Sequence, residues 1–207
     1  MAKLALLFCC LAALALPTTA RADLPSPGQS SVDPCVVLCP AGDLILHVVV
    51  RNAVGNVKPG AQVDLDFSAC PGFQLCAPNG SEPYTHLSGP GVEVLRMTSD
   101  AQGAAAFPVR AGGSCPAGSI IVRANGVPLA IRALASPDQN GDGIVGAQDI
   151  ALLQSRLGTT DPTGDLDCDA VVSNADLAIL QSHLGHACSL RTPSRPGTWG
   201  RIKMLYR

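Results

Sequence analysis

The chain has 207 residues, a formal net charge of −2 at pH 7, 14% charged residues and 3% aromatic residues. This near-neutral balance argues against nucleic acid and anionic membrane surfaces as partners, because both attract strongly basic proteins. The scarcity of aromatic rings also argues against a carbohydrate-binding face, on which sugar rings would stack.

Residues 1–22 are predicted to form a secretory signal peptide. Lys3 precedes an apolar run from Leu4 to Leu16, and the triplet Ala20-Arg21-Ala22 predicts cleavage before Asp23. The run is shorter than the roughly 20 residues of a membrane-spanning helix, and no other stretch of the sequence is longer. We therefore expect a secreted or cell-surface protein without a membrane span.

The rest of the chain is long enough for two small domains, so we expect a linker over 23–33 and domains over 34–134 and 135–188. In an exported chain without a Cys-x-x-Cys pair, disulfides are favoured over metal-thiolate or redox roles. Seven cysteines follow the signal peptide, so one thiol is free or paired with another chain, and the spacing leaves the connectivity open. These cysteines are Cys35, Cys39, Cys70, Cys76, Cys115, Cys168 and Cys188.

Residues 34–134 have the pattern of β-structure. The stretch "QVDLDFS" alternates apolar Val63, Leu65 and Phe67 with polar residues, which is the period of a strand with one buried face. Turn signals such as Asn125-Gly126 separate such runs, so the segment predicts an antiparallel sandwich. The other predicted strands are "DLILHVVVRN", "GVEVLRM", "AAAFPVR", "SIIVRAN" and "PLAIRAL".

Two phrases in this segment, "VVVRNAVGNVKPGAQVDL" and "TSDAQGAAAFPV", resemble bacterial immunoglobulin-like repeats of the invasin type. The resemblance implies an all-β immunoglobulin-like sandwich. The stretch "SACPGFQLCAPNGSEPYTH" is an insertion relative to that pattern, and we expect a long loop closed by a disulfide involving Cys70 or Cys76.

The same segment offers little for catalysis. The residue types of a hydrolytic triad are present in Ser81, Glu82 and His86, but the sequence lacks the Gly-x-Ser-x-Gly turn that exposes such a nucleophile. Glu82 and Glu93 could be assigned as the two carboxylates of a glycosidase, but so could any two carboxylates in a sequence. His47 lies among strand residues and is interpreted as packed or at an edge. We therefore expect a non-catalytic protein.

The stretch "DQNGDGIVGAQDIALLQSRLG", residues 138–158, predicts a calcium loop followed by a helix. Asp138, Asn140 and Asp142 occupy its first, third and fifth positions, and Asp149 occupies the twelfth. Ile144 at the seventh would contribute its backbone carbonyl. A calcium ion takes ~6–8 oxygens, which alternating short carboxylates in a tight loop can bring together.

A repeat 27 residues later supports this interpretation over that of an ordinary polar turn: "DLDCDAVVSNADLAILQSHLG". Its ligand positions are Asp165, Asp167, Asp169 and Asp176, with the carbonyl of Val171 at the seventh. Each loop precedes an amphipathic helix, which is too short to be stable alone, so the two helices are expected to pack together. The predicted apolar faces carry Ile150, Leu153 and Leu157 in the first helix and Leu177, Leu180 and Leu184 in the second, and the loop valines Val145 and Val172 are expected to pair back to back.

This duplicated loop-helix unit resembles a type I dockerin, which lacks the entering helix of an EF-hand. The resemblance implies a small all-α module with two calcium ions that docks onto a cohesin domain, commonly to tether enzymes that degrade polysaccharides. It also places recognition at the tenth and eleventh loop positions. Exposed pairs in the helices are further candidates. These residues are Ala147, Gln148, Gln154, Ser155, Asn174, Ala175, Gln181 and Ser182.

Three features depart from the dockerin pattern. Ala170 replaces the glycine at the sixth position of the second loop, so the second calcium site is expected to be weaker. Cys168 lies within the same loop. The usual Ser/Thr recognition pair is replaced in both repeats, so the partner specificity is expected to differ.

The sequence thus predicts an exported, non-catalytic protein with a calcium-dependent docking module for a cohesin-like partner. Two alternatives stay open. One is a calcium-stabilised structural surface protein without a cohesin partner, and the other is a tethered glycan hydrolase. Residues 189–207 are expected to form a basic tail, too short and sparse to bind nucleic acid.

Overall fold

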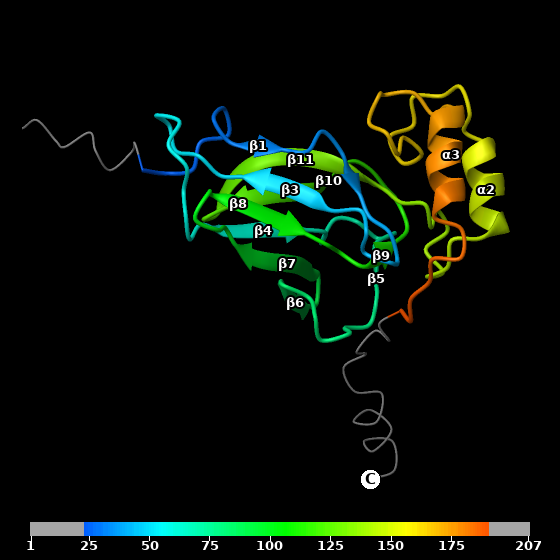
Figure 1. The fold of residues 1–207 in the computed structure, drawn as a ribbon, viewed down its shortest axis with the longest axis horizontal. Helices are drawn as coiled ribbons and strands as arrows, with labels where there is room; N and C mark the ends of the chain where they lie inside the picture. The colour runs from blue at the N-terminus through cyan, green and yellow to red at the C-terminus, as the bar shows by residue number, and fades with distance from the viewer. Residues whose placement is uncertain (1–22, 191–207) are drawn as a thin grey trace, which may run out of the picture.

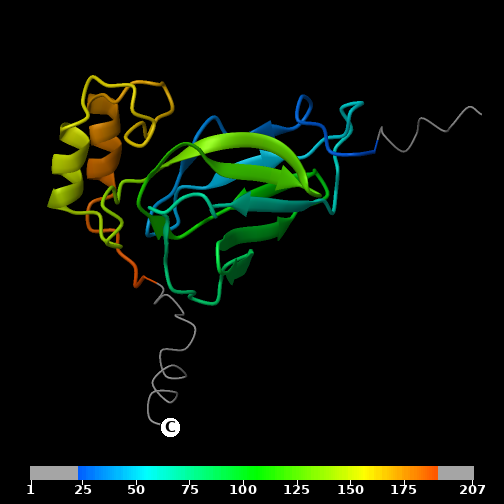
Figure 2. The ribbon, with the colours of Figure 1, turned by 180° about the vertical axis from the view of Figure 1, so that it is seen from behind.

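The computed structural model describes residues 23–190, so the predicted signal peptide and nearly all of the predicted tail lie outside the described residues. The chain is mainly β-structure, followed by two short helices at its C-terminal side. In Figure 1 the helices α2 and α3 lie side by side at one end of the β-structure, and Figure 2 shows the same arrangement from behind.

The larger sheet has six strands in the order β2-β11-β10-β4-β7-β6. Its neighbours pair antiparallel, except that β2 runs parallel to β11. The predicted turn at Asn125-Gly126 joins β10 to β11, and both residues have positive φ, as a tight hairpin turn requires. The bounds are β2 Val36–Val37, β4 Gln62–Asp66, β6 Thr85–Gly89, β7 Val92–Thr98, β10 Cys115–Ala124 and β11 Val127–Ala135.

A three-stranded sheet, in the order β1-β3-β8, packs against the larger one. Side chains of β3 and β8, such as Val48 and Phe107, share one buried cluster with Leu65 and Leu95 of β4 and β7. Burial of this apolar surface is the main stabilising contribution to the β-structure. The bounds are β1 Ser31–Val32, β3 Leu46–Val49 and β8 Ala104–Phe107, and a separate pair is formed by β5 Gln74–Leu75 and β9 Ala111–Gly112.

Two features differ from the sequence-based prediction. The predicted linker over 23–33 contains β1, which pairs with β3, because its backbone completes the edge of the three-stranded sheet. The predicted antiparallel sandwich is mixed, since Val36 and Val37 run parallel to Leu134 and Ala135. No hairpin joins β2 to β11, because the two strands lie far apart in the sequence. β2 can therefore run parallel to β11.

Helix α2 spans Ala147–Gln154 and helix α3 spans Asn174–Ser182. Leu153 and Leu180, one from each helix, are fully buried in a second apolar cluster. That cluster also contains Cys39 and Ala135 from the β-structure. The helix pair therefore packs on the β-structure as well as on itself.

Three disulfides join the chain: Cys35 to Cys168, Cys70 to Cys115, and Cys76 to Cys188. Two of them connect the β-structure to the loop-helix region, and the third lies within the β-structure, where it anchors the insertion at Cys70 as predicted. Cys39 is the free cysteine among residues 23–190, and it is buried. Multiple disulfides fit the oxidising conditions that an exported protein meets.

Candidate metal centre

The first predicted calcium loop runs from the end of β11 to the start of α2. Asp138 lies at its beginning and is fully buried. One carboxylate oxygen of Asp138 accepts hydrogen bonds from the backbone N–H groups of Gly141 (2.9 Å) and Asp142 (3.2 Å), and the other accepts from Gly143 (2.9 Å). Gly143 has φ +87°, the conformation expected at the sixth position of the loop.

Asp149 closes the first loop from inside α2. Its side chain is 1% exposed. One oxygen accepts from the N–H of Asn140 (3.1 Å) and the other from the N–H of Gly146 (2.8 Å), which caps the helix. A single buried carboxylate thus joins the start of the loop to the start of the helix.

The second loop repeats this pattern with different residues. Asp165 accepts from the N–H groups of Asp169 (3.2 Å) and Ala170 (2.9 Å). Asp176, fully buried in α3, accepts from Leu166 (2.6 Å) with one oxygen and from Ser173 (2.7 Å) with the other. The two loops therefore share one backbone design, as the duplication in the sequence predicts.

The third, fifth and seventh positions also correspond between the loops. Asp142 accepts from the N–H of Ile144 at 2.9 Å, and Asp169 accepts from the N–H of Val171 at 2.8 Å. In the first loop the side-chain amide of Asn140 donates to Asp142. In the second loop Asp167 occupies the position of Asn140. The carbonyl ligands expected from Ile144 and Val171 stay predictions.

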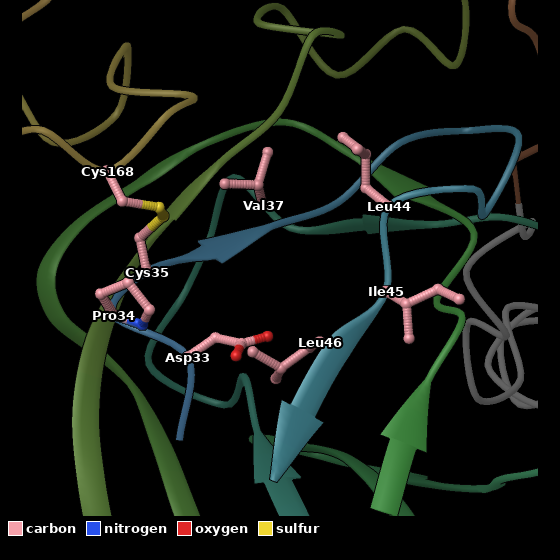
Figure 3. Close-up of a pocket in the computed structure, with 8 residues that line it drawn as sticks. All are labelled: Asp33, Pro34, Cys35, Val37, Leu44, Ile45, Leu46 and Cys168. Atoms are coloured by element: carbon pink, nitrogen blue, oxygen red, sulfur yellow. A yellow bond between two sulfur atoms is a disulfide. The ribbon is translucent and has the colours of Figure 1, made fainter. Parts of the chain in front are cut away.

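The second loop contains two backbone conformations that glycine would accept more readily. Ala170 has φ +72° and Cys168 has φ +66°. A left-handed conformation costs an ordinary residue roughly 1–2 kcal/mol, because its Cβ approaches the following carbonyl. The disulfide from Cys168 to Cys35 attaches this loop to the β-structure beside a mostly apolar pocket, which Val37, Leu44 and Ile45 help to line (Figure 3).

The charges of the loops favour a cation. Asp165, Asp167 and Asp169 place carboxylate oxygens within 4.8 Å of one another. Burial, together with the carboxylates of Asp149 and Asp142, raises the pKa of Asp138 to about 6. Desolvation and the nearby aspartates likewise raise the pKa of Asp167. Each shift reflects the cost of holding a negative charge in this environment, which a bound cation would offset.

None of the ion pairs formed among residues 23–190 involves the first or last aspartate of either loop. Buried carboxylates are costly unless a positive charge compensates them. Hard carboxylate and amide oxygens are the donors that calcium prefers. The grouped carboxylates of Asp165, Asp167 and Asp169 in the second loop could therefore hold such a cation.

The segments that follow the two helices form backbone hydrogen bonds with the two loops. The sequence predicts instead that Val145 and Val172 pair with each other. Val145 exchanges backbone hydrogen bonds with Gly185 and His186, beyond α3, while Val172 bonds Gly158 and Thr159, beyond α2. Each loop thus pairs with the segment that follows the other helix. The valine side chains are buried in the shared cluster of the helix pair.

Leu157 and Leu184 are 38% and 45% exposed, although the helical pattern places them on the packed faces. Both helices end before these residues, at Gln154 and Ser182. The chain then turns toward the opposite loop, so the helical period no longer determines which way these leucines point.

All eight residues predicted to bind a partner are solvent-exposed, and they come in matching pairs from the two repeats. The pairs near the helix ends leave the same two side chains, Gln and Ser, accessible in both repeats, whereas the pairs at the helix starts differ between the repeats. These residues are Ala147, Gln148, Gln154, Ser155, Asn174, Ala175, Gln181 and Ser182.

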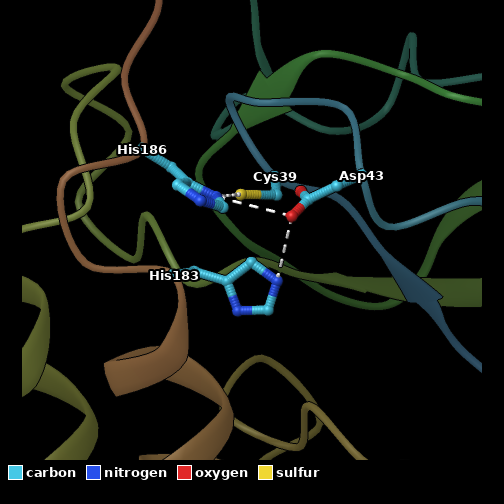
Figure 4. Close-up of side chains that lie close together, drawn as sticks. All are labelled: Cys39, Asp43, His183 and His186. Carbon is cyan, nitrogen blue, oxygen red and sulfur yellow. Dashed lines mark hydrogen bonds and ion pairs between the residues drawn. The ribbon is translucent and has the colours of Figure 1, made fainter.

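The structure also gathers residues that the sequence interpretation did not connect. Cys39, Asp43, His183 and His186 offer ligand atoms within 4.8 Å of one another (Figure 4). The His-x-x-His spacing after α3 was a usable signal. Its partners lie far away in the sequence, in the segment between β2 and β3, so the complete set required the fold.

Comparison of the chain with family models, curated proteins and solved structures found no match. Among residues 23–190, neither helix has the length and apolar character needed to cross a membrane.

Proposed function

We propose that this is an exported, non-catalytic protein whose C-terminal loop-helix pair is a dockerin-like module, which binds calcium and docks onto a cohesin-like domain of another protein. The observation that carries the proposal is the repeated loop design. In both loops the first and last aspartates are buried, lack a basic ion-pair partner within the described residues, and accept backbone N–H groups at matching loop positions.

Calcium is the cation that this donor set suits. Asp138, Asn140, Asp142 and Asp149 would hold it in the first loop, and Asp165, Asp167, Asp169 and Asp176 would hold it in the second. The bound ions would neutralise the buried carboxylates and fix the start of each helix. The second site would be the weaker, because Ala170 adopts its left-handed conformation at a cost.

The exposed faces of the helices are the proposed docking surface. Gln154 at the end of α2 and Ser155, which follows it, correspond to Gln181 and Ser182 of α3, and all four are exposed. Exposed Leu152 on α2 adds apolar area next to these polar groups. A surface of polar groups around accessible apolar side chains is the usual composition of a transient protein interface.

The residues considered for catalysis have other partners. His86 pairs with Glu93 at 2.5 Å. The hydroxyl of Ser81 donates to Asn79, and the carboxylate of Glu82 accepts the N–H groups of Asn79 and Gly80. These contacts support a structural role for the three residues in their turns and strands.

A structural role for calcium is the second candidate function. It is favoured by the two disulfides that join the loop-helix region to the β-structure and by the apolar cluster that both parts share. In that case calcium would stabilise the packed assembly, and the helix faces would need no partner.

Calcium titration by calorimetry on the disulfide-intact chain without its signal peptide tests the calcium sites. We expect two binding events. Asp149→Ala should abolish the first and Asp176→Ala the second, whereas Glu82→Gln, in a loop of the β-structure, should leave both unchanged. Titrations in which neither loop variant differs from the parent protein would rule out the proposed calcium sites.

Binding to a panel of cohesin domains, in calcium and in excess chelator, separates docking from a purely structural role. A calcium-dependent complex that is weakened at least about tenfold by Gln154→Arg combined with Gln181→Arg would support docking through these faces. Gln102→Arg, an exposed turn residue of the β-structure, is the matched control. Intact calcium binding without any cohesin complex would favour the structural role instead.

A further inference from the structure

We propose that Cys39, Asp43, His183 and His186 form a binding site for a zinc-class divalent cation, which links the β-structure to the segment after α3. The site uses none of the residues assigned to calcium, and it does not depend on the docking function. Cys39 and Asp43 come from the segment between β2 and β3, while both histidines follow the last turn of α3.

The four side chains converge on one point (Figure 4). The Sγ atom of Cys39 lies 3.4 Å from Nδ1 of His186. One carboxylate oxygen of Asp43 lies 3.5 Å from that same nitrogen and 3.5 Å from Nε2 of His183. One ligand atom from each residue therefore lies close enough to the other three for all four to bind a single metal ion.

These spacings match the edges of a zinc tetrahedron. Zinc binds thiolate sulfur at ~2.3 Å and imidazole nitrogen or carboxylate oxygen at ~2.0–2.2 Å, so tetrahedral ligand atoms are separated by about 3.3–3.7 Å. The three separations given above, 3.4, 3.5 and 3.5 Å, fall in this interval. Four protein ligands would complete the coordination of a structural site.

The orientation of His183 is also that of a metal ligand. Its Nδ1 lies 2.8 Å from the backbone carbonyl oxygen of Ile179, which can only accept a hydrogen bond. Nδ1 must therefore carry the proton, and in the neutral ring Nε2 presents a lone pair toward the carboxylate of Asp43. Two acceptors face each other there, which requires a further proton or a cation between them. A ring held through its other nitrogen is the usual second-shell arrangement of metal-binding histidines.

The donor set selects the class of cation. A thiol and two imidazoles are soft or borderline ligands that suit zinc and related transition metals and bind calcium and magnesium poorly. Burial raises the pKa of the Cys39 thiol to about 12, so the thiol is protonated in the metal-free protein. Binding of the cation would release that proton to solvent, as metal-thiolate bonding requires.

The fold holds both halves of the site. The carbonyl oxygen of Cys39 accepts from the N–H groups of Gly42 and Ala111, which fixes this segment against the β-structure. On the other side Gly185 has φ +84°, a conformation that turns the chain between the two histidines. Asp43 and His186 keep side-chain exposures of 45% and 33%, so solvent can deliver the ion. Cys39 is the one cysteine of residues 23–190 without a disulfide, which leaves its sulfur available.

Cobalt(II) titration of the disulfide-intact chain tests this site, because tetrahedral cobalt-thiolate sites absorb strongly in the near ultraviolet and visible. Saturating calcium is present throughout, so that the aspartate loops are occupied. We expect one equivalent of cobalt to give a thiolate-to-metal charge-transfer band together with tetrahedral visible bands, both of which zinc removes.

The variants assign the signal to the four residues. Cys39→Ser should remove the charge-transfer band, while His183→Gln and His186→Gln should each weaken cobalt binding by at least about 100-fold. His47→Gln, a histidine paired with Asp33 at the surface of β3, is the matched control and should bind as the parent protein does. The histidine variants retain Cys39, so they keep the test valid if the serine variant fails to fold.

Absence of cobalt binding by the parent protein in excess calcium would overturn the zinc proposal. Octahedral cobalt without a thiolate band, bound equally well by the His183→Gln and His186→Gln variants, would do so as well. Either result would leave the calcium sites of the two loops unaffected, since those are measured with calcium alone.

Discussion

Ala170 is one of two residues of the second loop, with Cys168, that adopt a left-handed conformation where the first loop has glycine. It has φ +72°, whereas the matching position in the first loop is Gly143, with φ +87°. The same turn is therefore made with glycine in one loop and against the preference of alanine in the other. Ala170 is exposed, so burial of its side chain contributes little to offset the conformation.

Ala170→Gly is expected to stabilise the protein by about 1 kcal/mol and to tighten calcium binding by the second loop, because glycine adopts this conformation without steric cost. Urea unfolding and calcium titration measure the two effects. Ala175→Gly, in the first turn of α3, is the matched control and should be destabilising by up to ~1 kcal/mol. Equal effects of the two substitutions would contradict the role assigned to the turn.

The sequence alone was enough to single out the aspartates of both loops, because their spacing is local and is written twice. Their role as calcium ligands stays a prediction. Burial of Asp138 and Asp176 was not predictable, since it depends on β-structure and helices that pack over the loops. The cluster of Cys39 and His186 was missed for the same reason. Its members lie far apart in the sequence and meet only at the junction.

At the scale of elements, α2 and α3 depend on each other and on the β-structure. Each has two turns or a little more, which is too short to be stable in isolation. Leu153 and Leu180 supply the fully buried contacts between them. The helical period predicted these two residues correctly. It failed at Leu157, where the helix has already ended.

Leu153→Ala is expected to lower the free energy of unfolding by about 3 kcal/mol, because it removes buried apolar surface and leaves a cavity. Leu152→Ala, the neighbouring leucine with 37% exposure, should cost less than about 1 kcal/mol. Chemical denaturation of the two variants in parallel gives the comparison. Similar losses of stability in the two variants would contradict the packing role assigned to Leu153.

Most strands were predicted from the alternation of apolar and polar residues and from the turn signals, as for Gln62–Asp66 and the hairpin at Asn125-Gly126. The strand β1 and the parallel pairing of β2 were not, since two-residue strands carry too few side chains to show a period. Their placement is determined by the edges of sheets that other segments build.

At the scale of the whole molecule, covalent bonds join regions that the sequence predicts as separate domains. Cys35 pairs with Cys168 over a separation of 133 residues, and Cys76 pairs with Cys188 over 112. Neither pairing was predictable, because spacing alone does not determine connectivity. The helix pair is therefore fixed to one end of the β-structure, as Figures 1 and 2 show.

The combined Cys76→Ser and Cys188→Ser substitutions are expected to destabilise the protein by about 4 kcal/mol, because the disulfide closes a long loop in the unfolded chain. They should also weaken calcium binding, since the segment held by Cys188 pairs with the first loop. Thermal unfolding and calorimetry measure both effects. Removing the disulfide from Cys70 to Cys115 should reduce stability but spare calcium affinity, and the opposite result would contradict this assignment.

The disulfide from Cys35 to Cys168 also determines how the molecule carries tension. If the chain is pulled from residues 23 and 190, the force enters at Cys35 and leaves at Cys188, and the disulfide from Cys188 to Cys76 lets it pass through the folded β-structure between Cys35 and Cys76. Only the residues outside these two bonds, 23–34 and 189–190, can extend while the β-structure stays folded, which amounts to roughly 50 Å for about 14 residues. Under load, β1 should therefore separate from β3 first, while α3 and the second loop, whose two ends are both bonded to the β-structure, stay folded.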